Sequence, residues 1–204
     1  MGKNNSKKLI SNIESIREGY QSYGVQGFYE RFGDGYRNPH ELAIRKVLRL
    51  AIEKWDINLS KVLDLACGSG EVTLALENLG CADIDGIDPY TYKAYLKRTG
   101  KNAEPYTFEQ IASGILSGRK YSLIICSFAL HLLEVSRLPV LVYQLGLIAD
   151  SMIIITPHKR PYLKESWGWV CLDEIVVEGV RARLYKHTYD KRNAGVQRIY
   201  SVFR

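Results

Sequence analysis

The chain has 204 residues, of which 46% are hydrophobic and 25% are charged, a composition typical of a soluble globular protein with one core. No apolar run reaches the roughly 20 residues that span a bilayer, which argues against an integral membrane protein. The net charge of +6 is uneven, because residues 1–50 and 156–204 carry an excess of Lys and Arg, whereas residues 51–155 carry an excess of Asp and Glu. A mildly acidic centre is therefore flanked by two basic ends.

The cysteines and histidines show no spacing typical of a metal or disulfide site. Cys67, Cys81, Cys126 and Cys171 form no C-x-x-C pair, and the four histidines lack ligand spacing. We therefore expect reduced, buried thiols, a cytoplasmic location and no metal.

The first 37 residues are predicted to form a cap segment. Apolar side chains at positions 9, 10, 13 and 16 have the spacing of one helix face. Residues 20–37 are rich in Tyr and Gly, and we expect loop and short turns there.

From residue 38 onward, strand-like and helical patterns alternate. The helix that follows is predicted to have Asn38 as its cap, Pro39 in its first turn and Glu41 completing a capping box. The expected strands are 61–66, 82–88, 103–106, 121–126 and 151–156, and the expected later helices are 71–79, 92–99, 108–117 and 137–149. Nearly continuous apolar strands that alternate with helices indicate a parallel sheet covered on both faces.

The last fifty residues change character. Residues 180–189 and 196–203 alternate with period two, and the turn-rich segment 190–195 joins them, which predicts an antiparallel hairpin. The predicted fold is α/β: a doubly wound, mostly parallel seven-stranded sheet with helices on both faces, a C-terminal antiparallel hairpin and an N-terminal helical cap. We expect one domain over 38–204, preceded by the cap at 1–37.

The stretch "VLDLACGSG" (62–70) predicts a ligand loop after the first strand. Glycines at 68 and 70 let backbone N–H groups approach a ligand at the carboxyl ends of the strands. A dinucleotide loop would carry a third glycine where Thr73 stands, and Asp64 would repel a pyrophosphate. A carboxylate there suits a ligand that carries an ammonium and a sulfonium group.

A second acidic residue, Asp88, ends the next strand in "GIDP". Its carboxylate can accept hydrogen bonds from both hydroxyls of a ribose, each worth on the order of 1.5–3 kcal/mol. The alternative is that "DIDGID" is simply a strand that ends in a turn.

Together, "VLDLACGSG", "GIDP" and "SLIICSFALHLL" resemble the class I (seven-stranded, Rossmann-like) S-adenosylmethionine-dependent methyltransferases. The resemblance implies a transferase that uses S-adenosyl-L-methionine. The cofactor-binding residues that it implies are Asp64, Ala66, Cys67, Gly68, Ser69, Gly70, Asp88, Pro89, Phe108, Glu109, Ser127, Phe128 and Ala129. Arg37 is our candidate for the carboxylate of the methionine moiety.

Methyl transfer from a sulfonium requires a positioned acceptor and, where that acceptor is protonated, a base. His131 and His158 follow the fourth and fifth predicted strands, and each is either a general base or a polar wall of the site. We favour His158 as the catalytic residue because Lys159 and Arg160 adjoin it.

The acceptor is predicted to contact Tyr29, Tyr36, Lys159 and Arg160, which lie in the aromatic and basic parts of the chain. A small-molecule acceptor is favoured, and RNA or protein is the alternative. Two other classes stay open: a catalytically silent binding protein with this fold, and a nicotinamide oxidoreductase, which the missing third glycine and Asp64 oppose.

The first six residues, "MGKNNS", match the signal for N-myristoylation at Gly2, and Lys7 and Lys8 follow. One acyl chain with a small basic patch would give weak membrane association. A chance match is the alternative.

Overall fold

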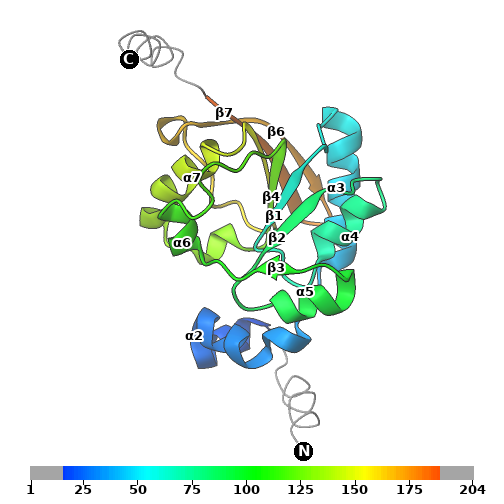
Figure 1. The fold of residues 1–204 in the computed structure, drawn as a ribbon, viewed down its shortest axis with the longest axis vertical. Coiled ribbons are helices and arrows are strands. Elements are labelled where there is room, and N and C mark those ends of the chain that lie inside the picture. The colour runs from blue at the N-terminus through cyan, green and yellow to red at the C-terminus, as the bar shows by residue number, and fades with distance from the viewer. Residues whose placement is uncertain (1–15, 189–204) are drawn as a thin grey trace, which may run out of the picture.

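The computed structural model describes residues 16–188, which form a sheet with helices packed on both faces (Figure 1). The seven strands are β1 (Val62–Leu65), β2 (Ile84–Ile87), β3 (Ala103–Glu104), β4 (Leu123–Ser127), β5 (Ser151–Thr156), β6 (Trp169–Val177) and β7 (Val180–His187). Their order is β3-β2-β1-β4-β5-β7-β6. The first five strands are parallel, and β7 runs antiparallel to both β5 and β6. The predicted fold class is confirmed.

The helices divide between the two faces of the sheet. They are α3 (Glu41–Trp55), α4 (Glu71–Glu77) and α5 (Tyr92–Thr99) on one face, and α6 (Phe108–Ala112) and α7 (Leu138–Gly146) on the other (Figure 1). In β4, Leu123 and Ile125 pack in the core under α3 and α4, whereas Ile124 and Cys126 pack under α6 and α7. Burial on both faces explains why the strands read as continuous apolar runs.

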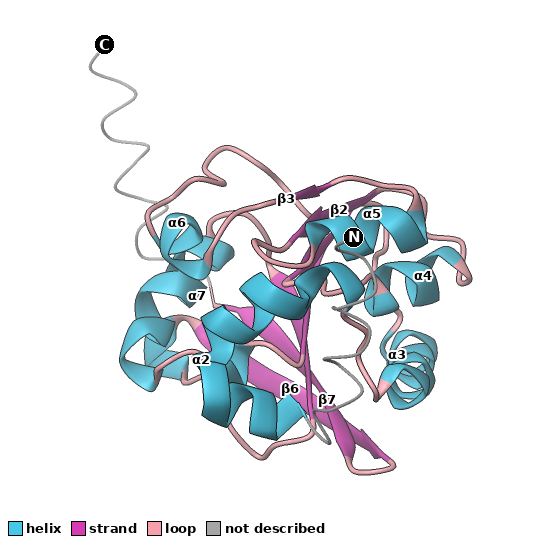
Figure 2. Ribbon diagram, turned by 90° about the horizontal axis from the view of Figure 1, so that it is seen from below, coloured by secondary structure: helices cyan, strands magenta, loops and turns pink. Residues whose placement is uncertain are grey.

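The prediction of loop and short turns over 20–37 is wrong. Residues Ile16–Phe32 form helix α2, which is kinked at Gly24, where φ is +68°, and the short helix η1 (Gly33–Gly35) follows. Aromatic packing overrides the weak helical propensity: the Phe28 ring lies 5.3 Å from the Tyr20 ring and 5.2 Å from the Phe32 ring. Seen from below, α2 lies across the end of the sheet (Figure 2).

The predicted capping box at the start of α3 does not form. His40, not Asn38, is the residue before the helix, and its side chain makes no capping hydrogen bond. The Asn38 Oδ1 instead accepts from the His40 backbone N–H at 2.9 Å, and the Glu41 carboxylate pairs with Arg45 and Arg98. Asn38 therefore closes a turn, which frees Glu41 for ion pairs.

The C-terminal hairpin exists, but its two strands are not the predicted pair. The strand expected at 180–189 is β7, and it pairs with β6 and β5. Glu178 and Gly179, with φ of +51° and +82°, join β6 to β7, as a tight type I′ turn requires. The segments 190–195 and 196–203 lie outside the described residues, as do Gly2 and most of the predicted helix at 9–16.

The predicted helix at 108–117 also ends early, at Ala112, before Gly114, where φ is +91°. Within residues 16–188, every helix is too short or too polar to cross a bilayer.

Candidate functional site

A cavity of about 220 Å³ lies at the carboxyl ends of β1, β2 and β4, where the strand order reverses. In doubly wound folds this switch point is where ligands bind. Helix α2 supplies Gln26 and Tyr29 to its lining. The predicted site residues that line this cavity are Tyr29, Tyr36, Asp64, Ala66, Cys67, Gly68, Asp88, Pro89, Phe108, Glu109, Ser127, Phe128 and Ala129.

Asp64 is a buried carboxylate with one oxygen unused. It is 1% exposed, and its Oδ2 accepts from the Thr73 backbone N–H at 3.1 Å and from the Thr73 hydroxyl at 2.7 Å. Its Oδ1 is buried and has no hydrogen-bond partner among the described residues. Burial raises the pKa of Asp64 to about 7; the charges of Glu71 and Asp88 add to this, and the Thr73 hydrogen bonds oppose it. An unpartnered oxygen of this kind is suited to a cationic ligand.

The two glycines of the loop serve different purposes. Gly68 lines the cavity, and its N–H donates to Asp88 Oδ2 at 3.2 Å. Gly70 does not line the cavity; a Cβ there would lie 2.4 Å from Thr99 Cγ2, and its φ is +91°. Gly70 is therefore required by the close packing of α5 against the loop.

Asp88 shapes the loops on both sides of it. Its Oδ1 accepts from the backbone N–H groups of Tyr90 at 2.9 Å and Thr91 at 2.8 Å, and its Oδ2 accepts from the backbone N–H of Gly68. Burial raises the pKa of Asp88, and these N–H donors oppose the shift. A carboxylate has about four acceptor positions, so three donors leave room for a ligand hydroxyl.

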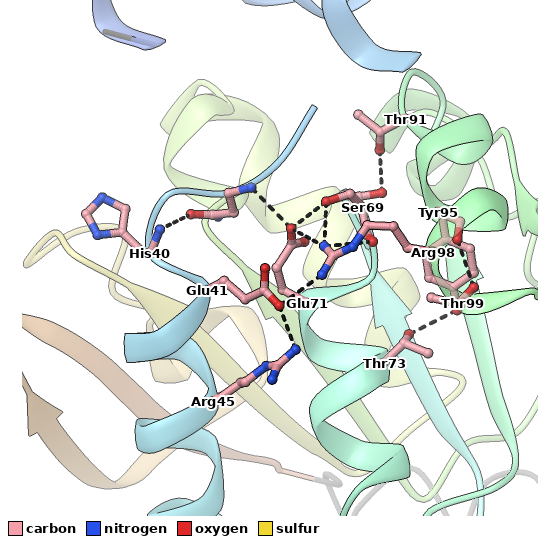
Figure 3. Close-up of polar contacts among 12 residues, drawn as sticks. His40, Glu41, Arg45, Ser69, Glu71, Thr73, Thr91, Tyr95, Arg98 and Thr99 are labelled. Carbon is pink, nitrogen blue, oxygen red and sulfur yellow. Dashed lines mark hydrogen bonds and ion pairs between the residues drawn. The ribbon is translucent and has the colours of Figure 1, made fainter. Parts of the chain in front are cut away.

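A buried polar network fastens the loop to the rest of the fold (Figure 3). Arg98 of α5 donates to the backbone oxygen of Ser69 at 3.2 Å, and to Ser69 Oγ, Glu71 Oε1 and Glu41 Oε1 at 2.9 Å each. Glu71, which is 4% exposed, also accepts from the Asn38 backbone N–H at 3.1 Å. One guanidinium thus links the loop, α3 and α4. Ser69, which was predicted to bind the cofactor, belongs to this network and does not line the cavity.

The cap side of the cavity is aromatic. The Tyr29 ring stacks on the Tyr90 ring at 6.0 Å and 12°, and meets the Tyr36 ring edge-on at 5.2 Å. The Tyr20 and Tyr29 hydroxyls are 2.6 Å apart. Burial raises the pKa of Tyr29 and of Tyr36, so both phenols are neutral at physiological pH.

The two predicted catalytic histidines lie together, but neither lines the cavity. Their ring centroids are 4.6 Å apart, and the His131 Nδ1 is buried without a partner among the described residues. Burial lowers the pKa of His131 to about 4, and the nearby His158 adds to this. His158 is exposed, and so are Arg37, Lys159 and Arg160, which also lie outside the cavity lining.

Residues 35–174 match a family model described as a methyltransferase domain. The chain belongs to this methyltransferase family. The methyltransferase is also 31% identical over 227 residues to an uncharacterized protein, C17A5.05c, of Schizosaccharomyces pombe, a match that covers 84% of this chain and 92% of the relative.

Solved structures share the fold of the methyltransferase. A magnesium protoporphyrin IX methyltransferase (ChlM) from Synechocystis PCC 6803, with bound S-adenosylmethionine, has a TM-score of 0.54 and 19% identity over 85% of this chain and 95% of that chain. An rRNA methylase from Escherichia coli has a TM-score of 0.54 and 16% identity over 85% of this chain and 78% of that chain. The fold and the family make this chain a class I enzyme that uses S-adenosylmethionine.

The cavity of the methyltransferase suits that cofactor. S-Adenosylmethionine carries an ammonium group, and no donor within residues 16–188 reaches the buried Asp64 Oδ1. The cavity also offers aromatic surface from Tyr106 and Phe108 beside Ile87 and Ile111. The residues present therefore fit a cation attached to a flat aromatic base.

Sequence reasoning missed several residues of the site. Asn38, Glu71, Tyr90, Tyr106 and Thr107 all line the cavity. Glu71 directly follows the glycine loop and lies in the first turn of α4. This position next to the loop could have identified it as a site residue from the sequence. Arg98 left no local signal, because its partners lie 27, 29 and 57 residues away along the chain.

Proposed function

We propose that this methyltransferase transfers a methyl group to a small-molecule acceptor by in-line displacement. The observation that supports a small acceptor is that α2 lies across the end of the sheet (Figure 2) and supplies Gln26 and Tyr29 to the lining of the cavity. An acceptor must then fit between this helix and the glycine loop.

The cofactor is proposed to lie along the carboxyl ends of β1 and β2. Asp64 Oδ1 would accept from its ammonium group, and the remaining acceptor position of Asp88 would accept from a ribose hydroxyl. Phe108 and Glu109 would border its adenine. Ser127, Phe128 and Ala129 would close the site at the end of β4.

The methionine carboxylate needs a donor, and the exposed Arg37 lies outside the cavity lining. Its neighbour Asn38 is buried and lines the cavity. Because Asn38 Oδ1 already accepts from His40, its amide nitrogen is the end left to donate. We therefore propose Asn38 in place of Arg37.

S-Adenosylmethionine supplies a methyl group on a sulfonium, a leaving group that is already activated. The chain contributes position and the exclusion of water: the neutral Tyr29 and Tyr36 and the buried glycine loop enclose the reacting groups. Where the acceptor loses a proton, His131 offers a neutral imidazole whose Nδ1 has no partner in the part of the chain that the structure describes, and His158 lies beside it.

RNA or protein is the second candidate acceptor. The exposed loop after β5 carries Lys159, Arg160 and Lys164, and Lys164 Nζ lies 5.2 Å from the centroid of the Trp167 ring. Basic and aromatic side chains together suit single-stranded nucleic acid. The E. coli relative is named as an rRNA methylase.

A cytoplasmic location is also proposed, because Cys67, Cys81, Cys126 and Cys171 are all free thiols. Acylation of Gly2, with weak membrane association, stays a separate proposal that intact-mass measurement of protein from a eukaryotic host would test.

Isothermal titration with S-adenosylmethionine, S-adenosylhomocysteine and NAD tests the cofactor. We expect the first two to bind and NAD not to bind. Incubation of a cell extract with tritiated S-adenosylmethionine then tests the acceptor. Enzyme-dependent label in a small molecule that separates from S-adenosylmethionine on chromatography supports the proposal. Saturable label in RNA or protein instead would contradict it.

A further inference from the structure

The charges around the cavity are acidic. Four carboxylates line it (Asp64, Glu71, Asp88 and Glu109), and no Lys, Arg or His between residues 16 and 188 does so. Two of the four are paired with basic residues outside the lining: Glu71 with Arg98 at 2.9 Å, and Glu109 with Arg137 at 2.7 Å. Asp64 and Asp88 have no ion pair within that range.

This arrangement disfavours an anionic acceptor. A phosphate or carboxylate on the acceptor would lose its hydration on entering the cavity and would meet carboxylates rather than a basic side chain. The basic residues that the sequence offers to an anion, Arg37, Lys159 and Arg160, are exposed and lie outside the lining. The reacting end of the acceptor therefore enters uncharged or positively charged.

The cap side adds a preference for positive charge. Tyr29, Tyr36 and Tyr90 line the cavity, and the stacked pair Tyr29–Tyr90 and the edge-on pair Tyr29–Tyr36 form a cluster of rings. The face of a phenol ring carries negative electrostatic potential and attracts ammonium groups. A desolvated site strengthens this attraction.

We infer that the acceptor is a small-molecule amine, whose nitrogen is held on the cap side of the cavity by the rings of Tyr29, Tyr36 and Tyr90. This rests on the proposed function and names its substrate class. The nitrogen lone pair forms the new N–CH₃ bond while the S–CH₃ bond breaks. The electron pair of the S–CH₃ bond stays on sulfur, which becomes a neutral thioether. Positive charge passes from sulfur to nitrogen, and a primary or secondary amine then releases one proton to solvent.

Such a transfer suits these surroundings better than transfer to an oxyanion. With an amine, one positive charge is present before and after the reaction, and the acidic lining of the cavity suits that charge throughout. With an anion, the charges cancel, and the carboxylates oppose binding of the acceptor.

The test is calorimetric titration of the complex with S-adenosylhomocysteine, using two probes of similar size. Benzyltrimethylammonium mimics a fully methylated amine, and benzenesulfonate is the anionic control. We expect the cation to bind at least about tenfold more tightly. The half-buried Tyr90 provides the variants: Y90L should weaken binding of the cation by about fivefold or more, and Y90F should stay within about threefold of the wild type.

The outcomes separate the two proposals. If S-adenosylhomocysteine does not bind, the proposed function fails, and the amine inference fails with it. S-adenosylhomocysteine could bind while benzenesulfonate binds as tightly as the cation, or while neither probe binds at millimolar concentration. Either result would overturn the inference of an amine acceptor and leave the cofactor assignment standing. Equal binding of the cation to Y90L and to the wild type, with both variants folded, would also overturn it.

Discussion

The two sides of the cavity are held together by different forces. On the side where the cofactor is proposed to bind, Arg98 and Glu71 join the loop after β1 to α3, α4 and α5 through charged hydrogen bonds. On the cap side, the kinked helix α2 is held mainly by contacts between rings, such as Tyr29 on Tyr90. Charged networks impose narrow geometry, whereas ring packing tolerates rearrangement.

This contrast indicates a division of labour. The side proposed to bind the cofactor presents a fixed arrangement of hydrogen-bond acceptors. The cap side offers an adaptable aromatic surface to the proposed methyl acceptor. Substitutions on the first side should affect folding and cofactor affinity, and those on the second should affect the acceptor alone.

The largest effect is expected from Arg98→Met. Glu41 and Glu71 would then share a buried site without a cation, at a cost of about 3 kcal/mol. For a chain of this size, the midpoint of thermal unfolding should fall by about 6–12 °C. Arg98→Lys is the matched control and should lose less. A midpoint within 2 °C of the wild type for Arg98→Met would show that the network is not structural.

Asp88→Ala comes next. It removes the proposed ribose acceptor as well as the acceptor for the N–H groups of Gly68, Tyr90 and Thr91. We expect affinity for S-adenosylmethionine and S-adenosylhomocysteine to fall by about 30- to 150-fold, equivalent to about 2–3 kcal/mol. Isothermal titration calorimetry measures both affinities. If they stay within threefold of the wild-type values, Asp88 does not belong to the cofactor site.

Gly70→Ala separates packing from ligand approach. The new Cβ would collide with Thr99 Cγ2 in a backbone conformation that disfavours side chains, and we expect about 2 kcal/mol of destabilisation. Adding Thr99→Ser removes the colliding methyl and keeps the hydroxyl that donates to the Tyr95 carbonyl. Partial recovery of the melting temperature in the double variant is predicted. No recovery, together with lost cofactor binding, would return Gly70 to the cofactor site.

The smallest effects are expected at the histidines. A general base would contribute about 10²-fold or more, but His131 and His158 lie outside the cavity lining. With an amine acceptor, His131→Asn and His158→Asn should each change turnover by less than about threefold. A hundredfold loss in either variant would identify that histidine as the general base and contradict an amine that binds in its neutral form.

The same contrast explains what the sequence could predict. The apolar runs of β1, β4 and β5 are buried on both faces, so their local pattern predicts the sheet. Asp64 lies in the second half of β1, and Gly68 and Asp88 follow β1 and β2, so chain order alone predicts that they meet at the carboxyl ends of the strands. Helix α2 was missed because its stability comes from rings that meet only in three dimensions.

The missed parts of the site have a similar cause. Arg98 and Glu71 come from separate elements, and no local pattern predicts their pairing. The strand partner of β7 was missed because the turn at Glu178 and Gly179 lacks the usual Asn-Gly or Asp-Gly signal.

The pH dependence of Asp64 tests the central claim, that its unused oxygen holds the cofactor ammonium. Because its pKa is raised to about 7 in the folded protein, the folded state binds more protons than the unfolded state between about pH 4 and 7. Without ligand, stability should therefore fall as the pH rises through this range. Affinity should change in the opposite direction, since only ionised Asp64 pairs with an ammonium.

Calorimetry with S-adenosylhomocysteine from pH 5.5 to 7.5, on the wild type and on Asp64→Asn, is the most direct measurement. Asparagine keeps an oxygen for Thr73 and removes the charge. We predict that wild-type affinity rises by up to about tenfold per pH unit below pH 7, and that the variant binds weakly with no such rise. A flat wild-type profile, or equal affinity in the variant, would contradict the account.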